Sequence, residues 1–370
     1  MDRTQIIQMS RPDISQVYAP TIEEAAAEGK LSGPDTHVEV AILRKSNRIP
    51  ALDFTKGALV LIMVLYHWMN YFVMADGSVY KYLRFLTPSF IFITGFLISQ
   101  VYLSKYQASR SHVPGRLLVR GFKLLAIVLC LNLVLSTVHL DGLRTRMGNW
   151  SLGDTLAAYF TGMAPVAFSV LVPIAYLLIL SAGLLLISLR YKDIFHFACA
   201  VFVGCALLLE LKGFRAGYLQ VFSIGMLGIS VGYIPINRIN SLLKHPLAIF
   251  IAYLGYLSAI TFWDDVYPLQ AVGVCLSLAV IYWIGRETAE TNQIGNVVVL
   301  LGHYSLFAYI AQIVILQFLR RSLSPLGNSI VVVGPAFLAG AALTILSVAI
   351  LDRARPRMAG LNRVYIAVFN

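Results

Sequence analysis

Ten long apolar segments follow one another along this chain, and their length limits the possible fold more than any other feature. Helices of about this length cross the ~30 Å hydrocarbon core of a bilayer. Unpaired backbone groups are costly in lipid, so such segments fold as helices. The segments are residues 57–74, 87–104, 115–138, 166–189, 194–211, 217–235, 246–263, 268–285, 294–319 and 328–351. The sequence therefore predicts an all-α integral membrane protein with about ten transmembrane helices.

The balance of residue types agrees with a membrane protein. Of the 370 residues, 58% are hydrophobic and 13% are charged, whereas soluble domains have about 25% charged residues. The net charge of +11 could suggest a nucleic-acid partner, but the placement of the basic residues indicates membrane topology instead. Four cysteines lie inside apolar segments without paired spacing, so we expect packing residues and neither disulfides nor metal ligands. They are Cys130, Cys199, Cys205 and Cys275.

The chain divides into a polar start, a long apolar region and a short end. Residues 1–46 have no sustained periodicity and no apolar core of a signal peptide, and we expect a mostly disordered cytoplasmic tail. Residues 47–359 form the predicted ten-helix transmembrane domain, and residues 360–370 a short C-terminal tail. Most of the 29 Lys and Arg residues lie before the first span, in every second loop or after the last span. By the positive-inside rule, both termini are expected to be cytoplasmic.

The first predicted span carries several polar residues on one narrow face. Lys56 and His67 are separated by three helical turns plus about 20°. Asp53 and Asn70 fall within roughly a quarter-turn of the same stripe, and Tyr71 follows directly. Ionisable groups at membrane depth are expensive and usually face a cavity or a partner helix. This face is therefore a candidate functional site.

His67 has two readings. It could be a structural histidine, hydrogen-bonded between helices, or a general base, since a neutral imidazole takes up a proton near neutral pH. No second histidine at ligand spacing surrounds it, so a metal site is not expected. Glu210 and Asp264 are two acids that could hold the imidazole from another helix or an outer loop.

The third predicted span begins with a basic stripe. Arg116, Arg120 and Lys123 follow an i, i+4, i+7 pattern. Ordinary anchoring at the cytoplasmic surface would explain Arg116 well and Lys123 poorly. Alternatively, the stripe could join Arg48 and Lys56 in a wall that binds phosphates, for which Arg and Lys are both suited.

The ninth predicted span carries a hydrogen-bonding face. Ser305, Tyr309 and Gln312 again follow an i, i+4, i+7 pattern inside a lipid-length helix. Such residues often hold transmembrane helices together, with about 0.6 kcal/mol per hydrogen bond. They could equally support a site within the helix bundle.

Two helix starts are also predicted. Asp53 is expected to cap the first span, where its charge complements the helix N-terminus. Thr87 followed by Pro88 is expected to cap the second span, because proline fits the first helical position.

The stretch around His67 resembles the start of a known superfamily. The matching residues are Arg48, Leu52-Asp53, Lys56-Gly57, Met63-Val64 and His67, followed by the run from Phe90 to Ile98. They resemble the transmembrane acyltransferase-3 superfamily, which includes polysaccharide O-acyltransferases, glucan succinyltransferases and heparan-α-glucosaminide N-acetyltransferases. The ninth span also looks like the late helix of that family, so the resemblance covers most of residues 47–351.

The resemblance implies an enzyme that transfers an acyl group from cytoplasmic acyl-CoA to an acceptor at the outer face of the membrane. By position, His67 takes the place of the family's catalytic histidine and Lys56 that of its donor-side arginine. Three residues depart from the pattern: Lys56 replaces arginine, Thr94 stands where serine is usual, and Gln312 stands where histidine is frequent. No catalytic role is therefore carried over to Gln312.

The apolar segments predict a multi-pass membrane protein, and the resemblance implies an acyltransferase of the bacterial inner membrane that moves an acetyl or succinyl group onto a glycan hydroxyl. The expected partners are acyl-CoA as co-substrate, a glycan or sugar acceptor and the lipid bilayer, with no tightly bound cofactor, no metal and no nucleic acid. Acetylation of a terminal amino sugar is an alternative within the same superfamily. A transporter, or an inactive scaffold for polysaccharide export, would also bury a few polar groups among ten helices.

Overall fold

A computed structural model gives the architecture of residues 49–369, apart from short gaps. It does not describe residues 74–76, 104–112, 138–152, 154–159, 161–167, 189–190, 192, 215–216, 264–265, 290 and 325–329. The described residues form helices and connecting turns and no strand. The predicted fold class, an all-α membrane protein, is thereby confirmed.

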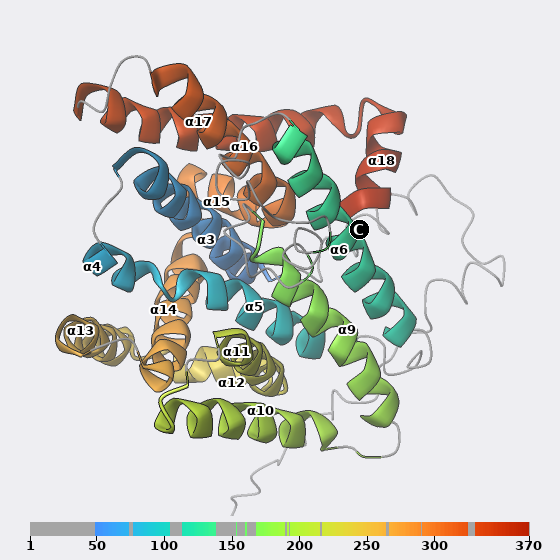
Figure 1. Ribbon diagram of the computed structural model, residues 1–370, viewed down its shortest axis with the longest axis vertical. Coiled ribbons are helices and arrows are strands. Elements are labelled where there is room, and N and C mark those ends of the chain that lie inside the picture. Colours follow the sequence, from blue (N-terminus) through green and yellow to red (C-terminus); the bar gives the residue numbers. More distant parts are fainter. Residues whose placement is uncertain are drawn as a thin grey trace, which may run out of the picture. The chain divides into compact units, whose positions relative to one another are not determined.

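The helices lie across one another in a bundle (Figure 1). They are α3 (Pro50–Trp68), α4 (Gly77–Tyr80), α5 (Leu86–Leu97), α6 (Val113–Thr137), α9 (Leu171–Ser188), α10 (Ile194–Leu211), α11 (Gly217–Gly232), α12 (Ile236–Leu242), α13 (Pro246–Phe262), α14 (Tyr267–Thr288), α15 (Gln293–His303), α16 (Ser305–Leu323), α17 (Ile330–Ala354) and α18 (Ala359–Phe369). Three short irregular turns extend or join them: the π-helical η2 (Met69–Val73) and η4 (Ile98–Leu103), and the 3₁₀ turn η3 (Lys81–Leu83).

Among the described residues, eight helices are long and apolar enough to cross a membrane, and nine if the bent pair α11–α12 forms one span. This pair bends by 101°. Each of the ten predicted segments contains a helix among its described residues, but the helix of the seventh, α13, has only 17 residues. The predicted ninth span is two helices, α15 and α16, because the chain turns at Tyr304, where ψ is 28°.

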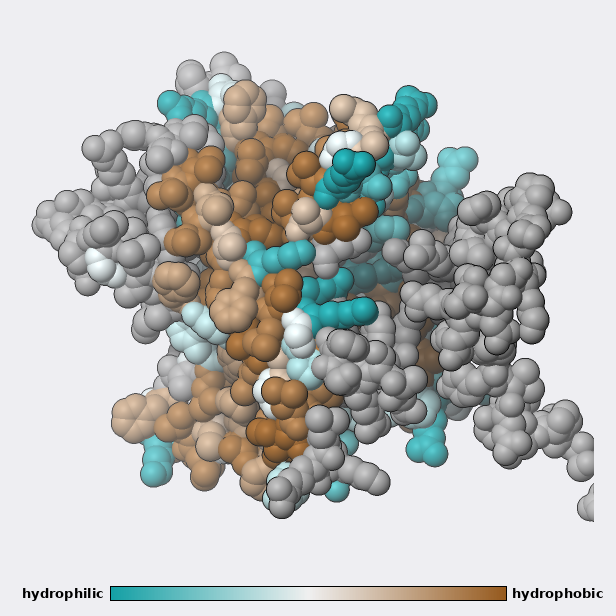
Figure 2. Space-filling view, turned by 90° about the vertical axis from the view of Figure 1, so that its right-hand side faces the viewer, coloured by the Kyte–Doolittle hydropathy of each residue, from teal (hydrophilic) through white to brown (hydrophobic). Residues whose placement is uncertain are grey.

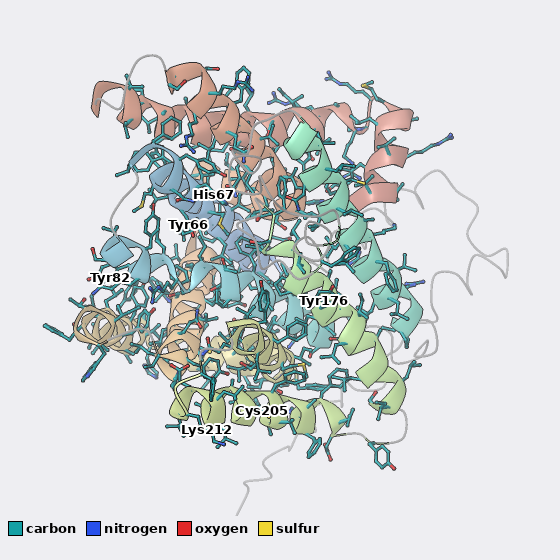
Figure 3. All side chains as sticks on the ribbon, viewed as in Figure 1. Tyr66, His67, Tyr82, Tyr176, Cys205 and Lys212 are labelled. Carbon is teal, nitrogen blue, oxygen red and sulfur yellow. The ribbon has the colours of Figure 1, made fainter. Side chains whose placement is uncertain are left out.

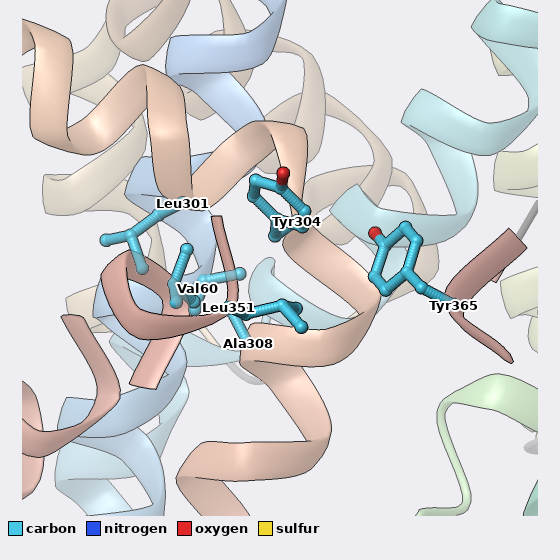
Figure 4. Close-up of a cluster of buried hydrophobic side chains, with 7 residues drawn as sticks. Val60, Leu301, Tyr304, Ala308, Leu351 and Tyr365 are labelled. Carbon is cyan, nitrogen blue, oxygen red and sulfur yellow. The ribbon is translucent and has the colours of Figure 1, made fainter. Parts of the chain in front are cut away.

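Helix α3 lies at the centre of the molecule, where α5, α14, α15, α16 and α17 pack against it. Its apolar side chains on several faces are buried, among them Leu59, Val60 and Val64. Figure 4 shows Val60 in one such cluster, against Leu301, Ala308 and the last turns of α17. Since α3 is surrounded by protein, its polar residues face other helices or a cavity instead of lipid.

Glycine lets α11 lie directly on α5. A Cβ added at Gly228 would overlap the backbone of Phe92, and one at Gly95 would overlap the backbone oxygen of Gly225. Small residues at such seams allow helix backbones in membranes to approach closely, which increases their dispersion contact. This seam holds α5 in place beside α3.

The outward faces of the bundle are apolar. Large hydrophobic side chains are exposed on several helices, including Phe122, Phe197, Leu247 and Phe262. Figure 2 shows one broad face of hydrophobic side chains with a hydrophilic group near its centre. Exposed apolar area on this scale is expected of a surface that contacts lipid.

Two predicted helix starts are wrong by part of a turn. Helix α3 begins at Pro50, so Asp53 lies inside its first turn and does not occupy the capping position. Helix α5 begins at Leu86 with Phe85 in the capping position, which moves Thr87 and Pro88 into its first turn. Proline is tolerated anywhere in a first turn, because the N–H groups there have no partner within the helix, so its presence does not fix the first residue.

Candidate active site

A cavity of about 420 Å³ opens between α3, α5, α6, α9, α16 and α18. Three of its lining residues are basic: Lys56 of α3, and Arg120 and Lys123 of α6. We call these three residues the basic group and the space the basic cavity. The rest of the lining is largely apolar, contributed mainly by α5 and α9.

The structure brings together three of the five residues that were predicted to bind the donor. Arg120 and Lys123 line the cavity because they are three positions apart and so share one face of α6. Arg116 is exposed and is not among the lining residues. Arg48 lies outside the described residues.

Lys56 is held by its own helix. Its ammonium group forms an ion pair with Asp53 one turn earlier, and both side chains are largely buried. A carboxylate in the first turn of a helix is stabilised by the N–H groups exposed there. Asp53 therefore orients Lys56 at the edge of the cavity, which gives the predicted supporting residue a definite position.

Three further polar side chains line the cavity: Thr94, Ser305 and Tyr309. Thr94 of α5 donates its hydroxyl hydrogen to the carbonyl of Phe90 over 2.9 Å and lines the cavity. Ser305, the first residue of α16, lines it as well. Beyond them the walls are apolar, from residues such as Ile93 and Ile174.

His67 lies near the end of α3 and is 9% exposed (Figure 3). Aromatic rings flank it: Tyr71 stacks on the imidazole at 5.7 Å, and Tyr66 meets it edge-on at 5.4 Å. Within the described part of the chain, neither imidazole nitrogen has a hydrogen-bond partner. A buried polar group without a partner costs about 1–3 kcal/mol, and such a group in a native structure needs an explanation, of which a catalytic role is one.

Helix α16 connects the basic cavity to the surroundings of His67. The ring of Tyr309 lines the cavity and lies 6.3 Å from that of Phe90. His67 is not among the residues that line the cavity. Further along the helix of Tyr309, the Gln317 amide donates a hydrogen bond to the hydroxyl of Tyr71, which stacks on the imidazole. Along α3, Lys56 and His67 are about 16 Å apart at 1.5 Å per residue. The site therefore runs from a basic end to an imidazole end, with α16 beside both.

The predicted polar face of α16 extends beyond the cavity. Ser305 and Tyr309 line the cavity, and Gln312 lies one turn further on, fully buried. Among the described residues, the Gln312 amide and the Tyr309 hydroxyl have no hydrogen-bond partner. Because these buried polar groups have no partner, they form no hydrogen bond that would link the described helices to one another.

Two other candidates do not lie at this site, and a third falls outside the described residues. Asn70 is exposed, because the chain changes from α-helical to π-helical geometry at Met69 and turns Asn70 away from the predicted stripe. Glu210 accepts a hydrogen bond from the Gln220 amide over 2.6 Å and lies on α10, whose end at Lys212 is far from His67 in Figure 3. Asp264 lies outside the described residues.

One part of the cavity wall was not predicted from the sequence. Val368 and Phe369 line the cavity from α18, where the sequence predicted only a short tail. Leu361, Tyr365 and Phe369 are spaced four apart, which is the pattern of an amphipathic helix. That spacing was the signal that could have revealed it.

Comparison with known proteins agrees with this geometry. A family model described as an acyltransferase domain, that of acyltransferase family 3, matches residues 49–353. No curated protein and no solved structure matched the chain. The match spans most of the chain and includes α3, α5, α6 and α16, which carry His67, the basic group and Tyr309. The chain therefore belongs to the acyltransferase-3 superfamily and is a multi-pass membrane acyltransferase.

Proposed function

We propose that this protein transfers an acyl group from cytoplasmic acyl-CoA to a hydroxyl of a glycan at the outer face of the membrane, with His67 as the general base. The observation that carries the proposal is the arrangement of the site. Lys56, at the basic end of the site, and a buried imidazole without a hydrogen-bond partner among the described residues lie about 16 Å apart along one helix.

The basic end fits the donor. CoA carries several phosphates at one end and its thioester at the other, joined by a long flexible arm. Arg offers a fork of donors and Lys a point charge, and both are used to bind phosphate. With its phosphates on Lys56, Arg120 and Lys123, the donor would extend along the largely apolar walls, and its thioester would reach Tyr309.

The imidazole end fits the chemistry. The acceptor hydroxyl attacks the thioester carbonyl, and His67 removes its proton as the new carbon–oxygen bond forms. The tetrahedral intermediate then collapses, the carbon–sulfur bond breaks, and the thiolate of CoA leaves and takes the proton. A positioned base contributes typically 10²–10⁴-fold to such a step. A neutral imidazole can accept this proton.

The location of His67 supports an acceptor on the outer side. With a cytoplasmic N-terminus, α3 runs from the cytoplasm outward, so Lys56 lies near the inner surface and His67 in the outer half of the bilayer. The donor and the acceptor could then meet inside the bundle without either crossing the membrane.

The test is a transfer assay with the purified protein in liposomes. It would supply acyl-CoA on one side and candidate acceptors on the other, and measure both CoA release and acylated product. Acceptors with a free hydroxyl and acceptors with a free amino group would separate glycan O-acylation from amino-sugar N-acylation. Solute movement without consumption of acyl-CoA would contradict the proposal and indicate a transporter.

A further inference from the structure

Helix α18 belongs to the cavity although it lies outside the matched family domain. The family model ends at residue 353, and α18 comprises Ala359–Phe369. Its last residues, Val368 and Phe369, line the basic cavity together with the basic group. In Figure 1, α18 lies beside α6, which carries two of the three basic residues. A helix outside the matched domain thus lines the same cavity as helices of that domain.

A cluster around Arg355 fixes the position of α18. The guanidinium group lies 4.0 Å from the ring centre of Tyr365 and donates hydrogen bonds to Asn362 over 3.0 and 3.3 Å. It also donates to the hydroxyl of Tyr304 over 3.1 Å, and that hydroxyl donates to Asp352 over 2.7 Å. Figure 4 shows Tyr304, at the turn between α15 and α16, and Tyr365 of α18. The cluster ties α18 to the end of α17 and to the start of α16.

Phe369 lies at the basic end of the cavity. Its ring stacks on that of Tyr365 at 4.9 Å and meets Phe307, near the start of α16, at 6.1 Å. The start of α16 is level with Lys56, because Gly302, just before it, packs on the backbone of Asp53 and Gly57. His67 is about 16 Å further along α3. The ring of Phe369 therefore lies at the end of the site that holds the three basic residues, and not at the end that holds the imidazole.

We propose that α18 forms the binding site for the nucleotide part of the acyl donor, with Phe369 against the nucleobase and the basic group on the phosphates. The proposal rests on the proposed function, which requires an acyl-CoA donor. Aromatic side chains stack on nucleobases, and basic side chains bind the attached phosphates. Phe369 is partly exposed and lines the cavity, so its ring is accessible to a ligand there.

The test compares two donors that differ only in the nucleotide. Acyl-CoA carries the nucleotide, whereas the corresponding S-acyl-pantetheine has the same arm and thioester without it. For Phe369→Ala we expect the KM for acyl-CoA to rise about tenfold, which corresponds to the loss of one base–aromatic stack. The kcat should stay the same, and the kinetics with S-acyl-pantetheine should not change.

Two further variants complete the test. Ile366→Ala removes an exposed side chain of the same helix that does not line the cavity, and its KM should match that of the wild type. Phe369→Leu retains an apolar side chain at the end of α18 but no ring, so it should fold and show the same selective loss as Phe369→Ala. Both variants would be compared by melting temperature.

Each remaining outcome overturns the inference in a recognisable way. An equal loss with both donors would show that Phe369 only supports the cavity wall. An unchanged KM for acyl-CoA in Phe369→Ala and Phe369→Leu would show that α18 does not contact the nucleotide. A wild-type protein that uses neither donor would instead disprove the proposed function itself, and the inference with it.

Discussion

Gly57 and Gly302 meet where α3 crosses α15, and neither position has room for a side chain. A Cβ at Gly302 would overlap the backbone oxygen of Asp53 and lie 3.0 Å from the nitrogen of Gly57. A Cβ at Gly57 would overlap the backbone oxygen of Val298. This contact fixes the start of α3, and with it Lys56, against the start of α16, and with it Ser305. Two segments far apart in the sequence thus form one end of the site.

The first prediction concerns this contact. Gly302→Ala should lower the melting temperature of the purified protein, because its methyl group meets rigid backbone. Overpacking of this kind costs about 1–3 kcal/mol, and displacement of α3 should also reduce donor binding. Gly255→Ala is the matched control, since nothing lies within 4 Å of a Cβ there. Equal melting temperatures for both variants would contradict the close approach of α3 and α15.

The second prediction concerns the basic group. Lys123→Glu should weaken acyl-CoA binding at least tenfold, an effect of about 1.4 kcal/mol, because it places a negative charge beside the phosphates. Lys56→Arg should bind nearly as well as the wild type, since arginine also binds phosphate. Isothermal titration calorimetry would measure both.

The control for the basic group is Lys244→Glu. It makes the same charge change at an exposed residue that is not among those lining the cavity. Its binding should remain close to that of the wild type. If Lys56→Ala and Lys123→Glu also bind acyl-CoA normally, the basic residues serve only as membrane anchors.

The fold class could be predicted because it depends on local composition. A segment such as 171–188 is apolar over a length that matches the bilayer, and no distant contact is needed to recognise it. The break at Tyr304 could not be predicted in this way, because long apolar runs lie on both sides of a few polar residues. The break depends on tertiary contacts: Gly302 packs on α3, and the Tyr304 hydroxyl donates to Asp352.

Local relations between site residues could be predicted from the sequence, whereas the arrangement of the helices around the site could not. The i+3 spacing of Arg120 and Lys123 places both residues on the same face of their helix, and no tertiary contact is needed to predict this. The relation of Asn70 to His67 assumed a regular helix, and the π-helical turn from Met69 changes it. The contribution of Phe369 depends on how α18 folds back, which the Arg355 cluster determines.

The third prediction concerns the orientation of the chain. With cytoplasmic termini, the end of α13 should face the outside of the cell and the turn before α13 should face the cytoplasm. Trp263→Cys and Lys244→Cys place single thiols at these two ends, and both positions are exposed. In a background without the four native cysteines, a membrane-impermeant thiol reagent should label residue 263 in intact cells, and residue 244 only after permeabilisation. The opposite labelling pattern would reverse the topology.

The fourth prediction concerns His67 and separates an enzyme from a transporter. A glycan hydroxyl has a pKa far above neutrality, so it attacks a thioester slowly unless a base removes its proton as the bond forms. His67→Ala should therefore fold and bind acyl-CoA, yet lose acyl transfer by at least about a hundredfold. Binding should survive because the basic group, which lines the cavity without His67, remains intact.

His67→Asn distinguishes a base from a structural histidine. Asparagine can form hydrogen bonds but is not a useful proton acceptor, so it should be nearly as inactive as alanine if His67 is the base. A structural histidine would give the reverse result: asparagine would partly restore activity, and activity would follow the melting temperature across the variants. The absence of a hydrogen-bond partner for His67 within the described residues favours the first outcome, because a histidine retained for structure is expected to have one. Near wild-type transfer by purified His67→Ala would remove His67 from the mechanism.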